Sequence, residues 1–166
     1  RNNVLITGEV PDEWVAPLKD LAQITIWNRQ SSYLMPYEKL METIPEIHGV
    51  INFAEINVDE EFIAKANNLK IIANASKGTD NLNLKLLEEH GIWATNTPGY
   101  FDYPVAEYVL AGMLLISRRM LAADNFVREN KWNAFEPGTW DGVSLTGKEL
   151  GIVGMGAIGL ALKTIA

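Results

Sequence analysis

Apolar and polar positions follow two alternating patterns along the first hundred residues. Short, nearly continuous apolar runs are typical of buried parallel strands. Between them, apolar residues recur every three or four positions, as in amphipathic helices. The apolar runs predict five strands, at 3–9, 23–28, 49–55, 69–76 and 92–97. The periodic segments predict four helices, at 11–22, 36–46, 59–68 and 83–91.

Residues at the ends of these segments support the helices. Asp59 suits an N-cap, because its carboxylate can accept a hydrogen bond from a free amide of the first turn. Gly91 suits the position after a helix C-terminus. Strands joined by helical crossovers run parallel, with right-handed connections. The pattern therefore predicts a doubly wound α/β domain over residues 1–99.

The pattern changes after this domain. Residues 104–130 predict one long helix, apolar nearly all round between Val105 and Ile116, which indicates burial on several sides. An irregular segment rich in Gly, Trp and Pro follows at 131–149. Residues 150–166 predict a strand over 150–154, a glycine-rich turn and the start of a helix. We expect residues 100–166 to be the first part of a second domain.

Charge and composition argue against several classes of partner. The 166 residues carry 14 Lys and Arg against 21 Asp and Glu, a net charge of −7. Nucleic acids and anionic membranes require a basic face, and the largest basic cluster is Arg118–Arg119. The longest apolar stretch is too short to span a bilayer. We therefore expect neither a nucleic-acid nor a membrane partner.

Cysteine and histidine bear on redox chemistry and catalysis. The chain has no cysteine, which excludes a disulfide framework and fits a reducing compartment. The first residues already resemble a strand, with no signal peptide before them, so we expect a cytoplasmic protein. The two histidines, His48 and His90, are isolated and predict no metal site. Neither lies beside the partner that a catalytic histidine needs.

The glycine-rich turn is the strongest local motif. The sequence GIVGMGAIG matches G-x-G-x-x-G, with glycines for a tight turn, a close approach to pyrophosphate and close packing of helix on strand. The helix N-terminus that follows offers free N–H groups and a partial positive charge. The motif predicts a dinucleotide site formed by Gly154, Met155, Gly156, Ala157, Ile158 and Gly159. The acidic residue expected about 20 residues further on would lie past Ala166, so NAD and NADP both remain open.

Three segments resemble the D-isomer-specific 2-hydroxyacid dehydrogenases. Residues 74–100 are similar to the family's glycine–x–aspartate–asparagine segment and its TNTPG strand, 105–119 to its interdomain helix, and 145–159 to its cofactor loop. The stretch ITGEVPDEW resembles the glyoxylate and hydroxypyruvate reductase branch. The resemblance implies a flavodoxin-like substrate domain, a Rossmann NAD(P)-binding domain, and hydride transfer between the cofactor and a small 2-oxo or 2-hydroxy acid.

The resemblance also implies substrate-binding residues. The backbone amides of Ser76, Lys77 and Gly78 match those that hold the substrate carboxylate, and a turn of N–H groups suits an anion. Lys77 replaces a small apolar residue; its ammonium either attracts the carboxylate or points to water. Phe53 stands where phosphoglycerate dehydrogenases carry arginine, which favours glyoxylate, hydroxypyruvate or pyruvate over a phosphorylated substrate. Tyr100 is expected to line the cleft or to pack at the hinge.

Other positions are assigned by the same resemblance. Val105 matches a residue beside the nicotinamide ribose; otherwise it packs at the hinge. Phe135 matches an aromatic residue that reaches the partner subunit's cleft, in a family that forms homodimers; otherwise the ring anchors its loop. Turn chemistry, rather than the resemblance, indicates that Asp80 and Asn81 fix their loop with their side chains; the alternative is that they contact the ligand.

The family's catalytic arginine, glutamate and histidine match no position up to Ala166. We therefore expect the chain alone to be inactive, as the truncated N-terminal half of a dehydrogenase. The alternative is a catalytically inactive binding or interaction module, such as a co-repressor of the same fold.

Overall fold

The computed structural model describes residues 1–27, 32–53 and 56–166, and the chain divides into two compact units. Unit 1 is Arg1–Pro98 and unit 2 is Gly99–Ala166. The predicted domain boundary, between residues 99 and 100, lies one residue further along the chain.

Unit 1 is built on a parallel sheet. In its described part, five strands pair in the order β2-β1-β3-β4-β5. They are β1 (Asn2–Ile6), β2 (Ala22–Ile26), β3 (Gly49–Asn52), β4 (Ile71–Asn74) and β5 (Trp93–Thr95). The order reverses between β1 and β3, as in the flavodoxin-like doubly wound fold, which confirms the predicted fold class. The predicted strand ends at Asn28 and at residues 54–55 lie outside the described residues.

The helices of unit 1 are shorter than predicted. They are α1 (Asp12–Val15), α2 (Tyr37–Thr43), α3 (Glu60–Lys65) and α4 (Leu84–Glu89). The 3-10 turns η1 (Ala16–Leu18) and η2 (Ile44–Glu46) follow α1 and α2. Each of these turns contains a proline, Pro17 or Pro45, which has no N–H for a helical hydrogen bond. The predicted cap is confirmed, because the Phe62 N–H donates to Asp59 Oδ1 at 2.9 Å.

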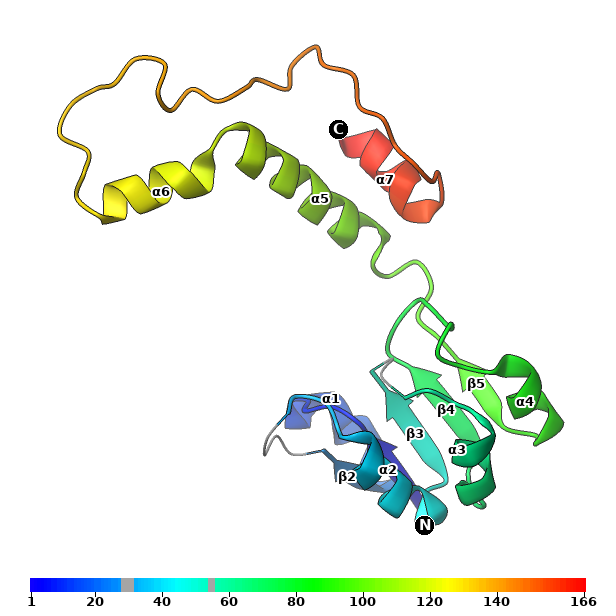
Figure 1. Ribbon diagram of the computed structural model, residues 1–166. Helices are drawn as coiled ribbons and strands as arrows, with labels where there is room; N and C mark the ends of the chain where they lie inside the picture. The colour runs from blue at the N-terminus through cyan, green and yellow to red at the C-terminus, as the bar shows by residue number, and fades with distance from the viewer. Residues whose placement is uncertain (28–31, 54–55) are drawn as a thin grey trace. The chain divides into compact units, whose positions relative to one another are not determined.

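The core of unit 1 lies between the sheet and three helices. Leu5, Val50 and Ile72 of neighbouring strands pack in one buried cluster with Leu40 of α2 and Phe62 of α3. Leu87 of α4 joins the same cluster, and Figure 1 shows α2, α3 and α4 on the near side of the sheet. The cluster fixes the strands and hence the loops at their ends.

The opposite face of the sheet is less covered. The strand register aligns Val4, Gly49, Ile71 and Trp93 in one row across β1, β3, β4 and β5. Side chains alternate between faces along a strand, so this row lies opposite the core cluster. Ile71 and Trp93 are exposed, although parallel sheets are usually buried on both faces.

Unit 2 contains two helices where the sequence predicted one. Helix α5 spans Asp102–Ser117 and α6 spans Met120–Arg128, so the prediction of one helix over 104–130 is wrong. Arg119, at the break, has a left-handed backbone with φ of 54°. A distant loop satisfies the groups at this break: the Val143 N–H donates to Ser117 O at 2.7 Å, and Arg119 Nη1 donates to Thr139 O at 2.7 Å.

Two further expectations for unit 2 are corrected. Residues 150–154 form no strand; a parallel strand needs a neighbouring strand for its hydrogen bonds, and the described part of unit 2 contains none. Helix α5 is not buried on several sides, since Ala106 is its one buried residue in the described chain. Ala106 packs with Ala161 and Leu162 of α7 (Ala157–Ile165), and Figure 1 shows α7 beside α5.

None of the helices in the described ranges is both long enough and apolar enough to cross a membrane.

Candidate functional site

The loop after β4, residues 75–82, lies at the carboxyl edge of the sheet. Ligands of open α/β sheets bind at this edge. The Ala75 N–H donates to Asn52 O at 2.6 Å, which extends the ladder between β3 and β4 by one residue. The loop then closes as a turn, in which the Leu82 N–H donates to Thr79 O at 2.9 Å.

Three asparagines tie this loop to the sheet. Asn52 and Asn74, the last residues of β3 and β4, are both buried, and Asn52 Nδ2 donates to Asn74 Oδ1 at 2.8 Å. Asn74 Nδ2 donates to Asn81 Oδ1 at 2.9 Å, and Asn81 Nδ2 donates to Ile56 O at 2.9 Å. Asn81 therefore fixes its loop as expected.

Asn52 and Asn74 were not predicted as functional residues from the sequence. The available signal was a polar residue at the same place, the end of an apolar run, in two neighbouring strands.

The predicted substrate-binding residues Ser76, Lys77 and Gly78 are consecutive in this loop, and all three of their carbonyl oxygens accept hydrogen bonds. Ser76 O accepts from the Thr97 N–H at 2.9 Å, and Lys77 O from Asn96 Nδ2 at 2.8 Å. Gly78 O accepts from Asn74 Nδ2 at 3.1 Å and from the Ser76 hydroxyl at 3.2 Å. The loop is thus fixed through its carbonyl groups.

The N–H groups of the same peptides point the other way. No peptide bond between described residues is cis, and a trans peptide directs its N–H opposite its C=O. The N–H groups of Lys77, Gly78 and Thr79 are therefore directed away from the groups that hold the three carbonyls. Exposed Gly78 has no side chain to cover this surface. Such an arrangement can bind an anion.

Phe53 lies at the point where the strand order reverses. It directly follows β3, and its N–H donates to the Thr7 hydroxyl at 3.3 Å. Its ring lies against Gly8, after β1, where an added Cβ would be 3.0 Å from the ring. The side chain therefore places an apolar surface at the carboxyl edge between β1 and β3, the usual ligand position of this topology.

The glycine-rich turn of unit 2 has the expected local geometry. Gly154 has φ of 96°, a conformation that favours glycine. Gly156 is the N-cap of α7, and the Leu160 N–H donates to Gly156 O at 2.9 Å. At Gly159 an added Cβ would clash with Gly154 O. The helix N-terminus and the backbone of Met155, Ala157 and Ile158 are thereby held next to one another.

Two other predicted residues lie near the start of α5. Tyr100 is 80% exposed, and its ring meets that of Phe101 edge to face, with centroids 5.8 Å apart. Val105 is also exposed, and its N–H donates to Phe101 O at 3.0 Å. Phe53 and the loop after β4 belong to unit 1, whereas Tyr100, Val105 and the glycine turn belong to unit 2.

The two histidines lie at the opposite, amino edge of the sheet. His48 directly precedes β3, and its Nδ1 accepts the Asn3 N–H at 3.1 Å. His90 follows α4, and its Nδ1 lies 2.9 Å from Leu86 O. Neither is at the edge that carries residues 75–82. In the residues that the structure describes, no group of three or more His, Cys, Asp or Glu side chains could hold a metal ion.

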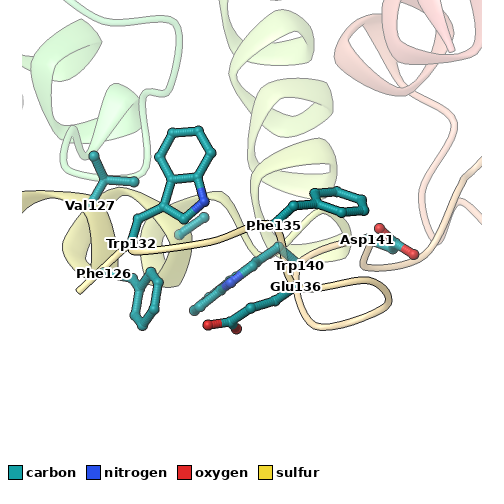
Figure 2. Close-up of a pocket in the computed structure, with 8 residues that line it drawn as sticks. Phe126, Val127, Trp132, Phe135, Glu136, Trp140 and Asp141 are labelled. Atoms are coloured by element: carbon teal, nitrogen blue, oxygen red, sulfur yellow. The ribbon is translucent and has the colours of Figure 1, made fainter. Parts of the chain in front are cut away.

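An aromatic pocket of about 250 Å³ lies between α6 and the following loop. Figure 2 shows Phe126 and Val127 from α6 facing this loop, with Trp132, Phe135 and Trp140 on it. The Phe126 and Trp140 rings are in contact, with centroids 4.7 Å apart. Phe135, predicted to reach a partner subunit, is 82% exposed.

Solved structures resemble this chain over nearly its whole length. The TT0316 protein of Thermus thermophilus has a TM-score of 0.91 at 30% identity, covering 98% of this chain and 52% of that protein. A putative D-isomer specific 2-hydroxyacid dehydrogenase, NAD-binding, of Polaromonas sp. JS6 66 has a TM-score of 0.87 at 27% identity, covering 99% and 51%. D-lactate dehydrogenase of Aquifex aeolicus, complexed with NAD and lactic acid, has a TM-score of 0.74 at 25% identity, covering 99% and 47%.

Sequence comparison points the same way. The chain is 35% identical over 164 residues to glyoxylate reductase of Thermococcus litoralis, which covers 96% of this chain and 49% of that protein. The chain thus spans about half the length of the curated relatives it matches. Residues 4–159 match the family model of the D-isomer specific 2-hydroxyacid dehydrogenase catalytic domain. The chain belongs to the D-isomer specific 2-hydroxyacid dehydrogenase family.

Proposed function

We propose that this chain is the N-terminal part of an NAD(P)-dependent oxidoreductase that interconverts small 2-oxo acids and D-2-hydroxy acids by hydride transfer. The observation that carries the proposal is the glycine turn, in which Gly154 is left-handed and Gly159 leaves no room for a side chain. This geometry brings the backbone and the N-terminus of α7 close to a pyrophosphate. Family membership supports the same chemistry.

The substrate side of the proposal rests on the loop after β4. We propose that backbone amides at Ser76, Lys77 and Gly78 bind the carboxylate of the 2-oxo acid. The carbonyl groups of these residues accept hydrogen bonds from other groups of unit 1, which directs the N–H groups of Lys77, Gly78 and Thr79 away from those donors. Phe53 offers no cation for a phosphate, so glyoxylate, hydroxypyruvate or pyruvate is the favoured substrate. The glyoxylate reductase relatives support this choice.

The cofactor side rests on residues of unit 2. We propose that the turn Gly154–Gly159 holds the pyrophosphate and that Val105 lies beside the nicotinamide ribose, with Tyr100 lining the substrate cleft. When bound, reduced nicotinamide supplies the hydride. The proposed cofactor is NAD or NADP, and the solved relatives described as NAD-binding or complexed with NAD support a nicotinamide dinucleotide at this turn.

We further propose that residues 1–166 alone do not catalyse the reduction of a 2-oxo acid. Hydride transfer to a carbonyl also requires a proton donor. The described histidines lie at the amino edge of the sheet, away from residues 75–82.

The test measures NADH oxidation with glyoxylate by this chain and by a polypeptide extended to the length of the curated relatives. We expect activity only in the extended form. Glyoxylate-dependent oxidation by the 166-residue chain would contradict the inactive-chain proposal. Binding of NADH and glyoxylate by the extended form without turnover would favour the alternative, a binding module or co-repressor.

We also propose a homodimer formed through unit 2. Apolar side chains stay exposed along α5 and α6 and in the loop that follows, as at Tyr108, Ile116 and Phe135, and exposed patches of this kind mark interaction surfaces. Phe135 would then reach the partner's cleft. Sedimentation velocity should show dimers that Tyr108→Glu or Ile116→Glu weakens. A monomer at every concentration tested would contradict the proposal.

A further inference from the structure

Two side-chain amides hold two consecutive carbonyls of the loop after β4. Asn96, which follows β5, donates from Nδ2 to Lys77 O at 2.8 Å. Asn74, the last residue of β4, donates from Nδ2 to Gly78 O at 3.1 Å. These side chains come from neighbouring strands, so the loop is held from two separate places in the sheet.

The two hydrogen bonds fix the directions of two N–H groups. Lys77 O shares its peptide plane with the Gly78 N–H, and Gly78 O shares its plane with the Thr79 N–H. Because both peptides are trans, each N–H points away from the asparagine that holds its carbonyl. Loss of either amide would free that plane to rotate.

The side-chain amide of Asn74 cannot flip over without losing its hydrogen bonds. Its Oδ1 accepts from Asn52 Nδ2 at 2.8 Å, and its Nδ2 donates to Asn81 Oδ1 at 2.9 Å as well as to Gly78 O. A flipped amide would place Oδ1 against the Gly78 and Asn81 oxygens. Buried, fully satisfied networks of this kind specify one arrangement.

We propose that Asn74 and Asn96 are positioning residues that orient the N–H groups of Gly78 and Thr79 toward the substrate carboxylate. This inference rests on the proposed function for its ligand and goes beyond it by naming the side chains that set the affinity. It also adds Thr79 to the peptides whose N–H groups face the anion.

The first experiment needs no ligand. Residual dipolar couplings report the directions of the Gly78 and Thr79 N–H vectors in the 166-residue chain. We expect Asn96→Ala to change the Gly78 coupling and Asn74→Ala to change the Thr79 coupling. Asn68→Ala is the matched control, because Asn68 Nδ2 donates to Pro45 O at 2.8 Å elsewhere in unit 1.

The second experiment titrates glyoxylate and follows the amide shifts of residues 76–79. Loss of one hydrogen bond is worth about 1 kcal/mol, so Asn96→Ala should weaken glyoxylate binding about fivefold. Asn74→Ala should weaken it further, and Asn68→Ala should not change it. If Asn74→Ala fails to fold, exposed Asn96 carries the test.

The outcomes separate the two proposals. Unchanged couplings in Asn96→Ala and in any folded Asn74→Ala would overturn the positioning role, as would unchanged glyoxylate affinity accompanied only by lower thermal stability. Absence of glyoxylate shifts in the unmodified chain would overturn carboxylate binding by this loop. The dipolar couplings would still decide whether Asn74 and Asn96 set the N–H directions.

Discussion

The two units of this chain bury their apolar residues very differently. In unit 1, three helices and a parallel sheet enclose one continuous core that contains the fully buried Phe62. In unit 2, the buried cluster of the described residues consists of Ala106, Ala161 and Leu162, with larger apolar side chains on the surface. The comparison shows that helical sequence alone does not make a core. Unit 1 should fold by its own contacts, whereas unit 2 should gain stability from whatever binds its exposed surface.

The largest effect should come from the core of unit 1. Phe62→Ala removes a fully buried ring and should lower the free energy of unfolding by about 3–5 kcal/mol. Urea unfolding followed by circular dichroism measures this change. The matched control is Phe135→Ala in unit 2, where the ring is exposed; at concentrations where the chain is monomeric, the change should stay within about 0.5 kcal/mol. Equal destabilisation by the two variants would contradict the conclusion that the two units bury their apolar residues differently.

A smaller effect is expected where α7 meets the glycine turn. Gly159→Ala places a Cβ against Gly154 O and should destabilise this contact by about 1–3 kcal/mol. Hydrogen exchange of the α7 amides measures the loss. Gly151→Ala is the control, because an added Cβ there meets nothing within 4 Å. Equal protection of the α7 amides in both variants would show that the contact between Gly159 and Gly154 does not determine the stability of α7.

Helix caps should have effects of about 1 kcal/mol. Asp59 and Asn83 each accept an N–H of the first turn of their helix, at 2.9 and 3.1 Å. If unit 1 unfolds cooperatively, Asp59→Ala and Asn83→Ala should lower its unfolding midpoint by similar amounts. Thermal unfolding measured by differential scanning calorimetry provides the comparison. A lower unfolding midpoint in only one of the two variants would show that unit 1 is less cooperative than its core suggests.

The smallest effects should come from exposed ion pairs, in both units. Lys39 Nζ lies 2.7 Å from Glu42 Oε2, and this hydrogen bond raises the pKa of Lys39. A raised pKa contributes stability below the unfolded value and loses it as pH rises through the folded value, so any small loss of stability caused by Glu42→Gln is present at neutral pH and disappears at alkaline pH. Nζ titration by NMR should show the Lys39 pKa falling. Asp124→Asn in unit 2 is the counterpart, and neither variant should measurably change unfolding at neutral pH.

The sequence was most informative where a pattern was repeated along the chain or depended only on neighbouring residues. Apolar runs alternating with helical spacing predicted the order of strands and helices in unit 1. Asp59 and the glycine turn were predicted from side-chain and backbone chemistry within a few residues of each position. The substrate-binding, cofactor and partner-contact assignments rest on family resemblance and stay predictions.

Features that depend on distant residues were missed. The break between α5 and α6 at Arg118 and Arg119 could not be predicted from the local sequence, because arginine favours helices. The groups that stabilise the break come from residues 139–143. The strand at 150–154 was predicted from its apolar pattern, but a strand also requires a partner. Asn52 and Asn74 each look like an ordinary strand end, and their pairing follows only from the adjacency of β3 and β4.

The contact between Gly159 and Gly154 has a consequence for the thermodynamics of binding. Because packing already holds the turn and the first residues of α7 together, little backbone entropy remains to be lost when an anion arrives. Affinity at this turn would then depend on how well the ligand replaces its own hydration, and nuclear relaxation of the turn should look nearly the same before and after binding. A turn without this contact would have to become ordered around each ligand.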